Sequence, residues 1–228
     1  MAKFLHKLFQ SKYDNPNPKS TEFEINNWEL SELLINKVVP HSGWHPFPLN
    51  ELMLMGGAVA RFRPEIIFEW GTHIGKSARI FYEVSEGLGL KPTIHSIDLP
   101  NEAEHVEHPH EQRGILAKGI RRVRLHEGDG IDTALSILKK WDKSGRKSNK
   151  ALFFIDGDHN YESVKRELSA ITENASEAPI LLHDSFYQSP DSKYNVGVHK
   201  AIKECLKKSR YRRIDTATGL PGMTLLYK

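Results

Sequence analysis

The sequence predicts a three-layer α/β fold, in which helices cover both faces of a seven-stranded, mostly parallel sheet. From residue 64 onward, short apolar segments alternate regularly with helix-like segments. This alternation is typical of parallel strands joined by crossover helices. Near the end of the chain, two further apolar segments flank the turn TGLPG, which predicts a hairpin and an antiparallel C-terminal strand.

Five parallel strands are predicted where short apolar runs lie between polar segments. They cover residues 66–70, 93–98, 123–126, 151–156 and 180–184. The hairpin takes its two strands from YRRIDTA (211–217) and GMTLLYK (222–228), and a predicted helix over 198–208 precedes it. The chain has 228 residues, which is enough for one such core with a small appendage.

The N-terminal part has a helical pattern without strands. A helical stretch over 23–39 is interrupted by the loop PHSGWHPFP (40–48), and a second helix follows over 49–61. We therefore divide the chain into an N-terminal segment, residues 1–50, and a main domain, residues 51–228. No run of apolar residues is long enough to span a bilayer.

At the start of the chain, Phe4, Leu5, Leu8 and Phe9 have helical spacing. Polar residues interrupt this apolar run and no small-residue cleavage site follows, so we do not interpret it as a signal peptide. We interpret it as a lid or as a subunit-contact helix of a possible homo-oligomer. Such a helix could also rest on a membrane surface.

Charge and cysteine content exclude several classes of partner and site. The net charge of +3, from 32 Lys and Arg against 29 Asp and Glu, is too small to predict nucleic-acid binding. We interpret the basic residues between His199 and Arg213 as a solvated helix face. Cys205 is the single cysteine, which rules out an intrachain disulfide and fits a cytoplasmic protein.

Acidic residues stand at or just beyond the end of every predicted parallel strand. They are Glu69, Asp98, Asp129, the pair Asp156 and Asp158, and Asp184. One such acid could simply cap a helix, but five successive strand ends are harder to attribute to capping. Because ligands of open parallel sheets bind beyond the carboxyl ends of the strands, this series predicts a ligand site.

The sequence GTHIG, residues 71–75, forms the first strand-to-helix turn, and Lys76 and Ser77 start the helix. Its two glycines permit a tight turn and the close approach of a ligand. The turn departs from the dinucleotide pattern Gly-x-Gly-x-x-Gly because His73 occupies the middle position. Glu69 before the turn would repel a pyrophosphate and attract an ammonium group. A nucleoside with an amino-acid tail fits such a turn, and Asp98 is placed to accept hydrogen bonds from its ribose.

Five segments together resemble a known family: E-x-G-x-x-x-G-x-S at 69–77, IHSID, EGDGID, LFFIDGDHNYESV and ILLHDSF. They are similar to the class I S-adenosylmethionine-dependent methyltransferases, which have a Rossmann-like fold. More narrowly they resemble the metal-dependent O-methyltransferases of the catechol type and of the macrolide-sugar and cephalosporin-hydroxylase-like group. The resemblance covers about residues 51–228. It implies methyl transfer from S-adenosylmethionine to a hydroxyl of a small-molecule or saccharide acceptor, assisted by Mg²⁺.

The resemblance also implies roles for individual residues. Residues implied to bind the cofactor are Glu69, Gly71, His73, Gly75 and Ser77 around the methionine part, Asp98 at the ribose, Asp129 and Gly130 at the adenine, and Asp156. Asp156 and Asp184 are implied to bind the metal, and His159 to be the catalytic base. Mg²⁺ held by carboxylates lowers the pKa of a bound hydroxyl, and a histidine can accept the proton near neutral pH.

The sequence departs from the catechol pattern after the last acid, where Ser185 stands in place of Asn. The third protein ligand is therefore left open between Asp158, His183 and Ser185. His159 could also be an ordinary loop histidine, and His183 could simply bond to the backbone. We interpret Trp70 and Phe81 as core residues.

Two other features have a structural and a functional interpretation. The segment NEAEHVEHPHEQR (101–113) holds three histidines, but Pro109 disrupts their helical spacing, so we interpret it as a solvated loop or a gate over the cofactor. The aromatic and histidine residues of 41–48 form either a substrate cover or ordinary packing. Two rival functions also remain, a non-catalytic S-adenosylmethionine-binding accessory protein and a nicotinamide-dependent oxidoreductase.

Overall fold

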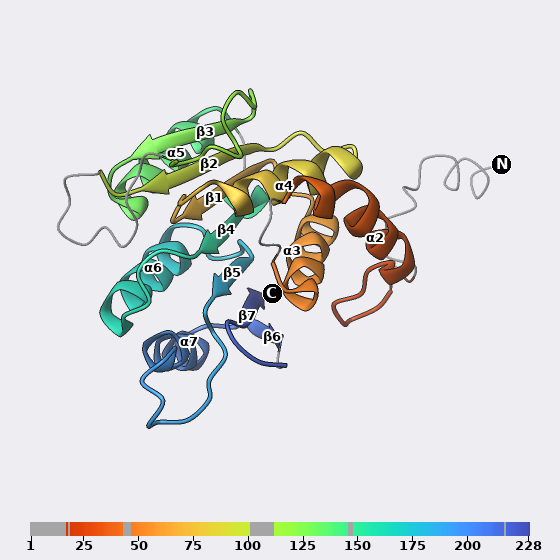
Figure 1. Ribbon diagram of the computed structural model, residues 1–228. Coiled ribbons are helices and arrows are strands. Elements are labelled where there is room, and N and C mark those ends of the chain that lie inside the picture. Colours follow the sequence, from red (N-terminus) through yellow and green to blue (C-terminus); the bar gives the residue numbers. More distant parts are fainter. Residues whose placement is uncertain (1–16, 18, 43–46, 101–111, 146–147, 217) are drawn as a thin grey trace.

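A seven-stranded sheet runs through the computed structural model, in the order β3-β2-β1-β4-β5-β7-β6 (Figure 1). The parallel strands are β1 (Ile66–Trp70), β2 (Thr93–Asp98), β3 (Val123–Glu127), β4 (Ala151–Ile155) and β5 (Ile180–His183). The hairpin strands β6 (Arg212–Asp215) and β7 (Met223–Tyr227) pair antiparallel, and β7 joins β5. The predicted fold class is confirmed, including the antiparallel C-terminal strand.

The structure describes residues 17, 19–42, 47–100, 112–145, 148–216 and 218–228. The predicted amphipathic helix at the start of the chain and nearly all of the His-rich segment lie outside these residues. Within the described ranges, no helix is long and apolar enough to cross a membrane.

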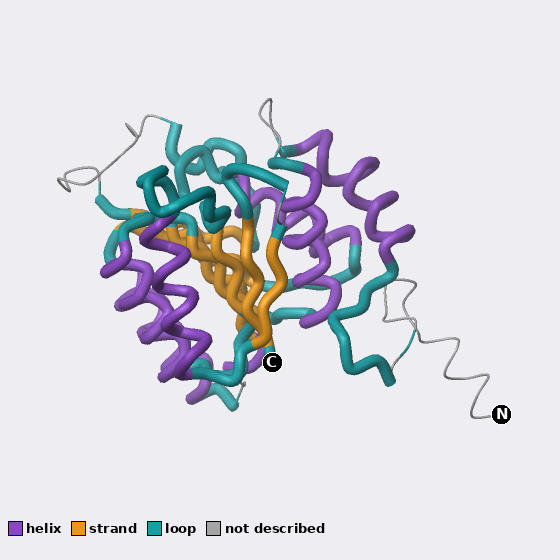
Figure 2. The backbone as a smooth tube through the Cα atoms, turned by 90° about the horizontal axis from the view of Figure 1, so that it is seen from below, coloured by secondary structure: helices purple, strands orange, loops and turns teal. Residues whose placement is uncertain are grey.

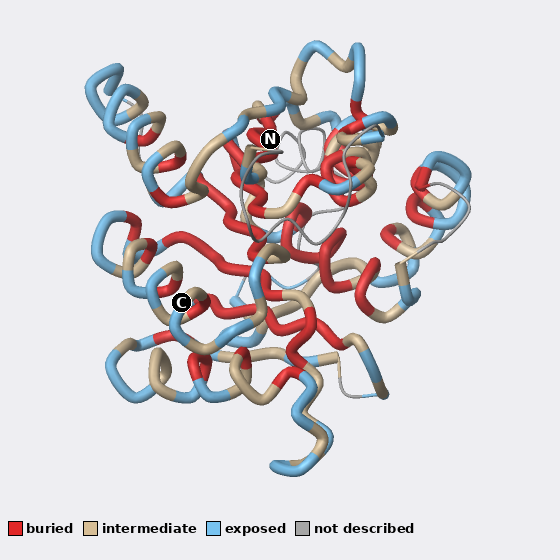
Figure 3. The backbone as a smooth tube through the Cα atoms, turned by 60° about the vertical axis from the view of Figure 1, so that its left-hand side comes forward, coloured by how far each residue is buried: buried red, intermediate tan, exposed pale blue. Residues whose placement is uncertain are grey.

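Helices cover both faces of the sheet, so that the strands lie between two helical layers (Figure 2). One layer consists of α2 (Asn27–Leu33), α3 (Leu49–Phe62) and α4 (Lys76–Gly87), and the other of α5 (Gly130–Lys143), α6 (Tyr161–Asn174) and α7 (Val196–Lys208). Side chains alternate along each strand, so Ile67 packs with the first layer while Phe68 packs with the second. The central strands are therefore buried on both faces (Figure 3).

Core positions follow the sequence prediction closely. Trp70 and Phe81 are 4% and 0% exposed, which confirms both as core residues. Leu30 and Leu33 of α2 are also buried, in the same cluster as the side chains of α3 and α4. The described part of the N-terminal segment thus packs into the main core.

The predicted N-terminal helix over 23–39 differs in the structure. It begins only at Asn27, because the Asn26 side chain caps it by accepting a hydrogen bond from the backbone N–H of Glu29 at 3.3 Å. Its second half changes to a π-helix over Leu34–Val38 and a 3₁₀ helix over Val39–His41. Part of the predicted loop is therefore helical.

The strand boundaries also shift slightly at the acids. β4 and β5 each end one residue before the predicted boundary, which places Asp156 and Asp184 just beyond the strands. Asp184 has a φ of 52°, which a strand cannot accommodate. Both acids thus lie just beyond their strands at the carboxyl edge of the sheet, and Asp184 is turned out of the ladder.

Candidate functional site

A cavity of about 920 Å³ lies beyond the carboxyl ends of the parallel strands. Most of the predicted site residues line it: Gly71, His73, Ser77, Asp98, Asp129, Gly130, Asp156, His159 and Asp184. Glu69 and Gly75 do not line it. The parallel topology explains the convergence, because the carboxyl ends of parallel strands meet at one edge of the sheet.

The turn after β1 brings two stretches of backbone into contact. Gly71 has a φ of 94°, and a Cβ atom at this position would lie 2.1 Å from the carbonyl oxygen of Asp156. Only glycine fits such a close approach. Gly75 has a φ of 80° at the N-terminus of α4, where it packs against Gly114. Glycine at these two positions therefore permits the backbone conformation and the close packing of the turn.

Glu69 is fully buried beneath this turn. Its Oε1 accepts a hydrogen bond from the Ser77 hydroxyl. Burial raises the pKa of the Glu69 carboxyl to about 8, and the nearby charges of Asp156 and Asp98 act in the same direction. The carboxyl is thus mostly protonated near neutral pH, and the structure places it under the turn instead of on the cavity wall.

Asp98 at the end of β2 organises the same turn from the side. Its Oδ2 accepts hydrogen bonds from the backbone N–H groups of Thr72 and His73, at 3.1 and 3.3 Å. Its Oδ1 accepts from the N–H of Leu99 at 2.9 Å. The carboxylate also lines the cavity, so one side chain both fixes the turn and faces the ligand space.

The end of β3 leads into the far wall of the cavity. Asp129 caps α5 by accepting a hydrogen bond from the N–H of Asp132 at 3.0 Å, and it pairs with Arg166 at 2.8 Å. Burial opposes the ionised form of Asp129, but these two partners hold its pKa below the ordinary value. Gly130 lies against the Trp70 indole, where a Cβ atom would come within 2.6 Å of the ring. The Nε1 atom of this indole is buried and has no hydrogen-bond partner within the described residues.

Three side chains at the carboxyl ends of β4 and β5 form a compact cluster. His183 Nδ1 lies 2.9 Å from Asp156 Oδ1 and 3.0 Å from Asp184 Oδ2. The ligand atoms of these three residues all lie within 4.8 Å of one another, as in a metal site. Of the three candidates for a third ligand, the structure brings only His183 into this cluster.

The other two candidates make different contacts. Asp158 accepts hydrogen bonds from the backbone N–H of Asn160 at 2.9 Å and from the Ser163 hydroxyl at 2.6 Å. Ser185 accepts one from the Thr224 hydroxyl at 2.9 Å and is buried. Asp158 therefore stabilises the start of α6, and Ser185 stabilises the contact with β7.

The side chains of the cluster shift one another's pKa values strongly. Although burial opposes ionisation, the charge of His183 and hydrogen bonds from His159 and His183 hold the pKa of Asp156 well below its ordinary value. Burial likewise opposes a charged His183, but Asp156, Asp184 and Glu51 raise the pKa of this imidazole strongly. Without another cation, His183 therefore carries the positive charge of the cluster.

Glu51 is a member of the site that the sequence prediction missed. It is 1% exposed, its Oε2 lies 3.0 Å from His183 Nε2, and its Oε1 accepts a hydrogen bond from the N–H of Gly222 at 2.8 Å. The single acid in the mainly apolar stretch LNELMLM was the available signal, because buried acids need a partner.

His159 reaches the same cluster from the loop before α6. Its Nε2 lies 3.1 Å from Asp184 Oδ2 and 3.9 Å from Asp156 Oδ1. Tyr194, also missed from the sequence, donates its hydroxyl to Asp184 Oδ1 at 2.6 Å. The predicted base thus stands beside both predicted metal ligands.

A family model described as "Methyltransferase domain" matches residues 68–185, which include the glycine turn, the acids and His159. The chain belongs to this methyltransferase family. The family resemblance found in the sequence is thereby confirmed. A search of curated proteins found no match.

Several solved structures share the fold of this chain. A putative O-methyltransferase from Klebsiella pneumoniae is 20% identical to this methyltransferase, with 99% of this chain and 94% of that chain covered and a TM-score of 0.53. The O-methyltransferase TomG from Streptomyces achromogenes, in complex with SAM, is 16% identical, with 99% of this chain and 95% of that chain covered and a TM-score of 0.54. CalS11, a TDP-rhamnose 3'-O-methyltransferase, is 18% identical, with 94% of this chain and 97% of that chain covered and a TM-score of 0.52. At these identities the similarity establishes the fold.

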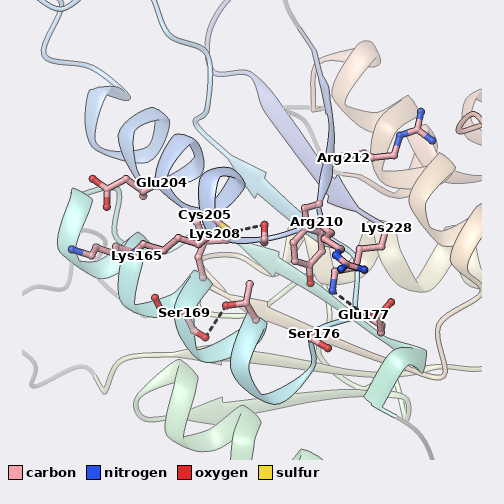
Figure 4. Close-up of a pocket in the computed structure, with 15 residues that line it drawn as sticks. Lys165, Ser169, Ser176, Glu177, Glu204, Cys205, Lys208, Arg210, Arg212 and Lys228 are labelled. Carbon is pink, nitrogen blue, oxygen red and sulfur yellow. Dashed lines mark hydrogen bonds and ion pairs between the residues drawn. The ribbon is translucent and has the colours of Figure 1, made fainter.

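The methyltransferase has a second cavity, of about 710 Å³, between α6, α7 and the start of β6 (Figure 4). Basic side chains surround it, among them Lys165, Lys208 and Arg210, while Cys205 lies half-buried in its wall. No predicted site residue lines this cavity. Lys208 and Arg210 are exposed, in agreement with a solvated basic surface in this part of the chain.

Proposed function

We propose that this protein transfers the methyl group of S-adenosylmethionine to a hydroxyl oxygen of a small-molecule or saccharide acceptor. The observation that carries this proposal is the position of His159, 3.1 Å from Asp184 and beside Asp156, at the cavity that begins with the glycine turn. A proton acceptor and two carboxylates thus stand next to a nucleoside-sized space.

The cavity residues fit S-adenosylmethionine. The volume of the cavity, about 920 Å³, lies in the range of small-molecule sites. Asp98 faces the space as a hydrogen-bond acceptor suited to ribose hydroxyls, and the polar Asp129 and apolar Ile131 provide a wall for a purine. The cofactor supplies a methyl group already activated by its positive sulfur, so the protein mainly has to position and deprotonate the acceptor.

The cluster at β4 and β5 fits a divalent cation. Asp156 and Asp184 offer hard carboxylate oxygens of the kind that Mg²⁺ binds, which is the ion expected from the sequence. A bound cation would supply charge that favours the ionised form of an acceptor hydroxyl.

Within this arrangement, His159 donates its Nε2 proton to Asp184, and its other ring nitrogen, Nδ1, accepts the acceptor's proton. Asp184 orients the imidazole through its 3.1 Å contact and stabilises the charge that develops on it. Tyr194 holds Asp184 in place from the opposite oxygen. The walls of the cavity exclude water from part of the site and align the acceptor oxygen with the methyl group.

Among possible acceptors, a hydroxyl-rich saccharide fits the cavity and the fold. A saccharide is supported by the fold that this chain shares with CalS11, a TDP-rhamnose 3'-O-methyltransferase. Polar side chains at the cavity, including Asn160, Ser163 and Arg166, suit a hydroxyl-rich ligand. We also propose a cytoplasmic location, because Cys205 has no second cysteine with which to form a disulfide.

Calorimetry of the full chain tests the proposal. We expect S-adenosylhomocysteine to bind in the micromolar range, about 8 kcal/mol, and NAD not to bind. Tight binding of NAD would favour an oxidoreductase and contradict the proposal. Cofactor binding with no methyl transfer to any member of a panel of phenols and glycosides would favour the accessory protein.

A further inference from the structure

We infer that His183 is a nitrogen ligand of the divalent cation, that Glu51 orients it, and that the site therefore prefers a first-row transition-metal ion over Mg²⁺. This inference rests on the proposed function, since it concerns the metal of the same site. It changes the expected ion and adds a residue from a distant helix.

The donor separations in the cluster fit one small ion. His183 Nδ1 is 2.9 Å from Asp156 Oδ1 and 3.0 Å from Asp184 Oδ2. Ligand atoms at right angles around an ion with bonds of about 2.1 Å are about 3 Å apart. The imidazole thus occupies a corner next to both carboxylates, and an ion can take the place between the three side chains.

Glu51 fixes which nitrogen of His183 faces the carboxylates. Its Oε2 lies 3.0 Å from Nε2, on the side of the ring opposite to Nδ1. A carboxylate can only accept, so Nε2 keeps the proton that it donates to Glu51. A bound ion would displace the other proton, at Nδ1, which faces Asp156 and Asp184. Such a carboxylate behind a ligating histidine orients the ring and makes it a better ligand.

Glu51 is itself held rigidly. It is 1% exposed, and its second oxygen accepts the N–H of Gly222 at 2.8 Å. The ring of His183 also packs edge-on against Phe47, with ring centres 5.2 Å apart. The position of Nδ1 is therefore determined before any ion binds, which favours an ion that gains from a nitrogen ligand.

The ligand set has consequences for the choice of ion. Mg²⁺ prefers an all-oxygen environment, whereas imidazole nitrogen favours ions such as Co²⁺, Fe²⁺ and Zn²⁺. Two carboxylates and one imidazole thus form a mixed site. We expect the full chain to bind Co²⁺ at least about 10-fold more tightly than Mg²⁺.

Calorimetric titration with CoCl₂ and MgCl₂ tests this expectation in the full-length protein and its variants. His183→Asn places an amide oxygen near the position of Nδ1, so it should weaken Co²⁺ binding about 10-fold or more and change Mg²⁺ binding much less. Asp184→Asn should abolish the binding event, which identifies the site. Equal losses for both ions, or no loss, in His183→Asn would overturn the inference.

Glu51→Gln tests the positioning role. The amide has one acceptor oxygen for two donors, the N–H groups of Gly222 and of His183 Nε2. Co²⁺ affinity should fall about 10- to 100-fold, but only when His183 is present, so the same change in the His183→Asn background should have little further effect. Glu83→Gln, which removes a 2.7 Å ion pair with Arg79 on α4, is the matched control and should leave Co²⁺ affinity unchanged. Equal effects of Glu51→Gln in both backgrounds would contradict the role.

The same titrations separate this inference from the proposed function. Binding of Co²⁺ and Mg²⁺ with unchanged affinities in His183→Asn contradicts the inference while a metal-assisted methyltransferase stands. Selective Co²⁺ binding without any binding of S-adenosylhomocysteine supports the inference and contradicts the proposed function. Binding of neither ion overturns the metal part of both.

Discussion

His159 Nε2 lies 3.1 Å from Asp184 Oδ2, although the two residues come from different strand ends of the sheet. This contact joins the predicted base to a predicted metal ligand.

Replacing His159 with Ala should lower kcat about 10²- to 10⁴-fold, the usual effect of losing a general base. The affinity for S-adenosylhomocysteine should change little. The wild-type rate should rise with pH as the imidazole loses its proton. The measurement is a pH-rate profile of both proteins with one acceptor that the wild type methylates. His126→Ala removes an imidazole that contacts His95 instead of the cavity and serves as control. A variant that keeps the wild-type acid limb and most of its rate would show that His159 is not the base.

Asp98→Ala should weaken S-adenosylhomocysteine binding by at least about 10-fold, because it removes a half-buried, charged hydrogen-bond acceptor from the cavity wall. The structure adds a second reason, since the same carboxylate holds the N–H groups of Thr72 and His73. Asp142→Ala, at the exposed end of α5, is a suitable control. Isothermal calorimetry gives the affinities, and an unchanged value for Asp98→Ala would remove this residue from the cofactor site.

Gly71→Ala should destabilise the fold by about 3 kcal/mol or more, because its Cβ would overlap the carbonyl oxygen of Asp156 at 2.1 Å. Gly89 offers a matched comparison, since its φ is also positive, at 69°, but no atom lies within 4 Å of its Cβ position. Gly89→Ala should cost only about 1 to 2 kcal/mol. Urea denaturation measures both, and equal losses would mean that the close approach to Asp156 has no energetic weight.

Glu69→Gln should change how stability depends on pH. Burial raises the pKa of Glu69 from 4.5 to about 8, so between these values the folded protein holds a proton that the unfolded chain has released. The wild type should therefore lose a few kcal/mol of unfolding free energy between pH 5 and pH 8, relative to Glu69→Gln, which cannot titrate. Denaturant unfolding at both pH values provides the comparison. Parallel pH profiles for the two proteins would show that Glu69 is ionised in the folded state.

The sequence by itself determined the succession of strands and helices along the chain. It also determined the edge of the sheet where the site lies. Period-two and helical patterns report which side chains are buried, and this information is local. The ends of β1 and β2 were therefore predicted to the residue. Parallel topology then required Asp98, Asp156 and Asp184 to converge, because the carboxyl ends of parallel strands share one edge.

The tertiary structure alone decided which neighbours these residues have. His183, Asp158 and Ser185 were equivalent candidates along the chain, and only the direction of each side chain separated them. Glu51 lies 132 residues from His183 in sequence, and no local pattern predicts a contact across that distance. Glu69 had the sequence position of a ligand-facing acid, but the turn at Gly71 closes over it. Local periodicity determines the elements, whereas the packing of distant elements against one another determines the contacts and the charges within the site.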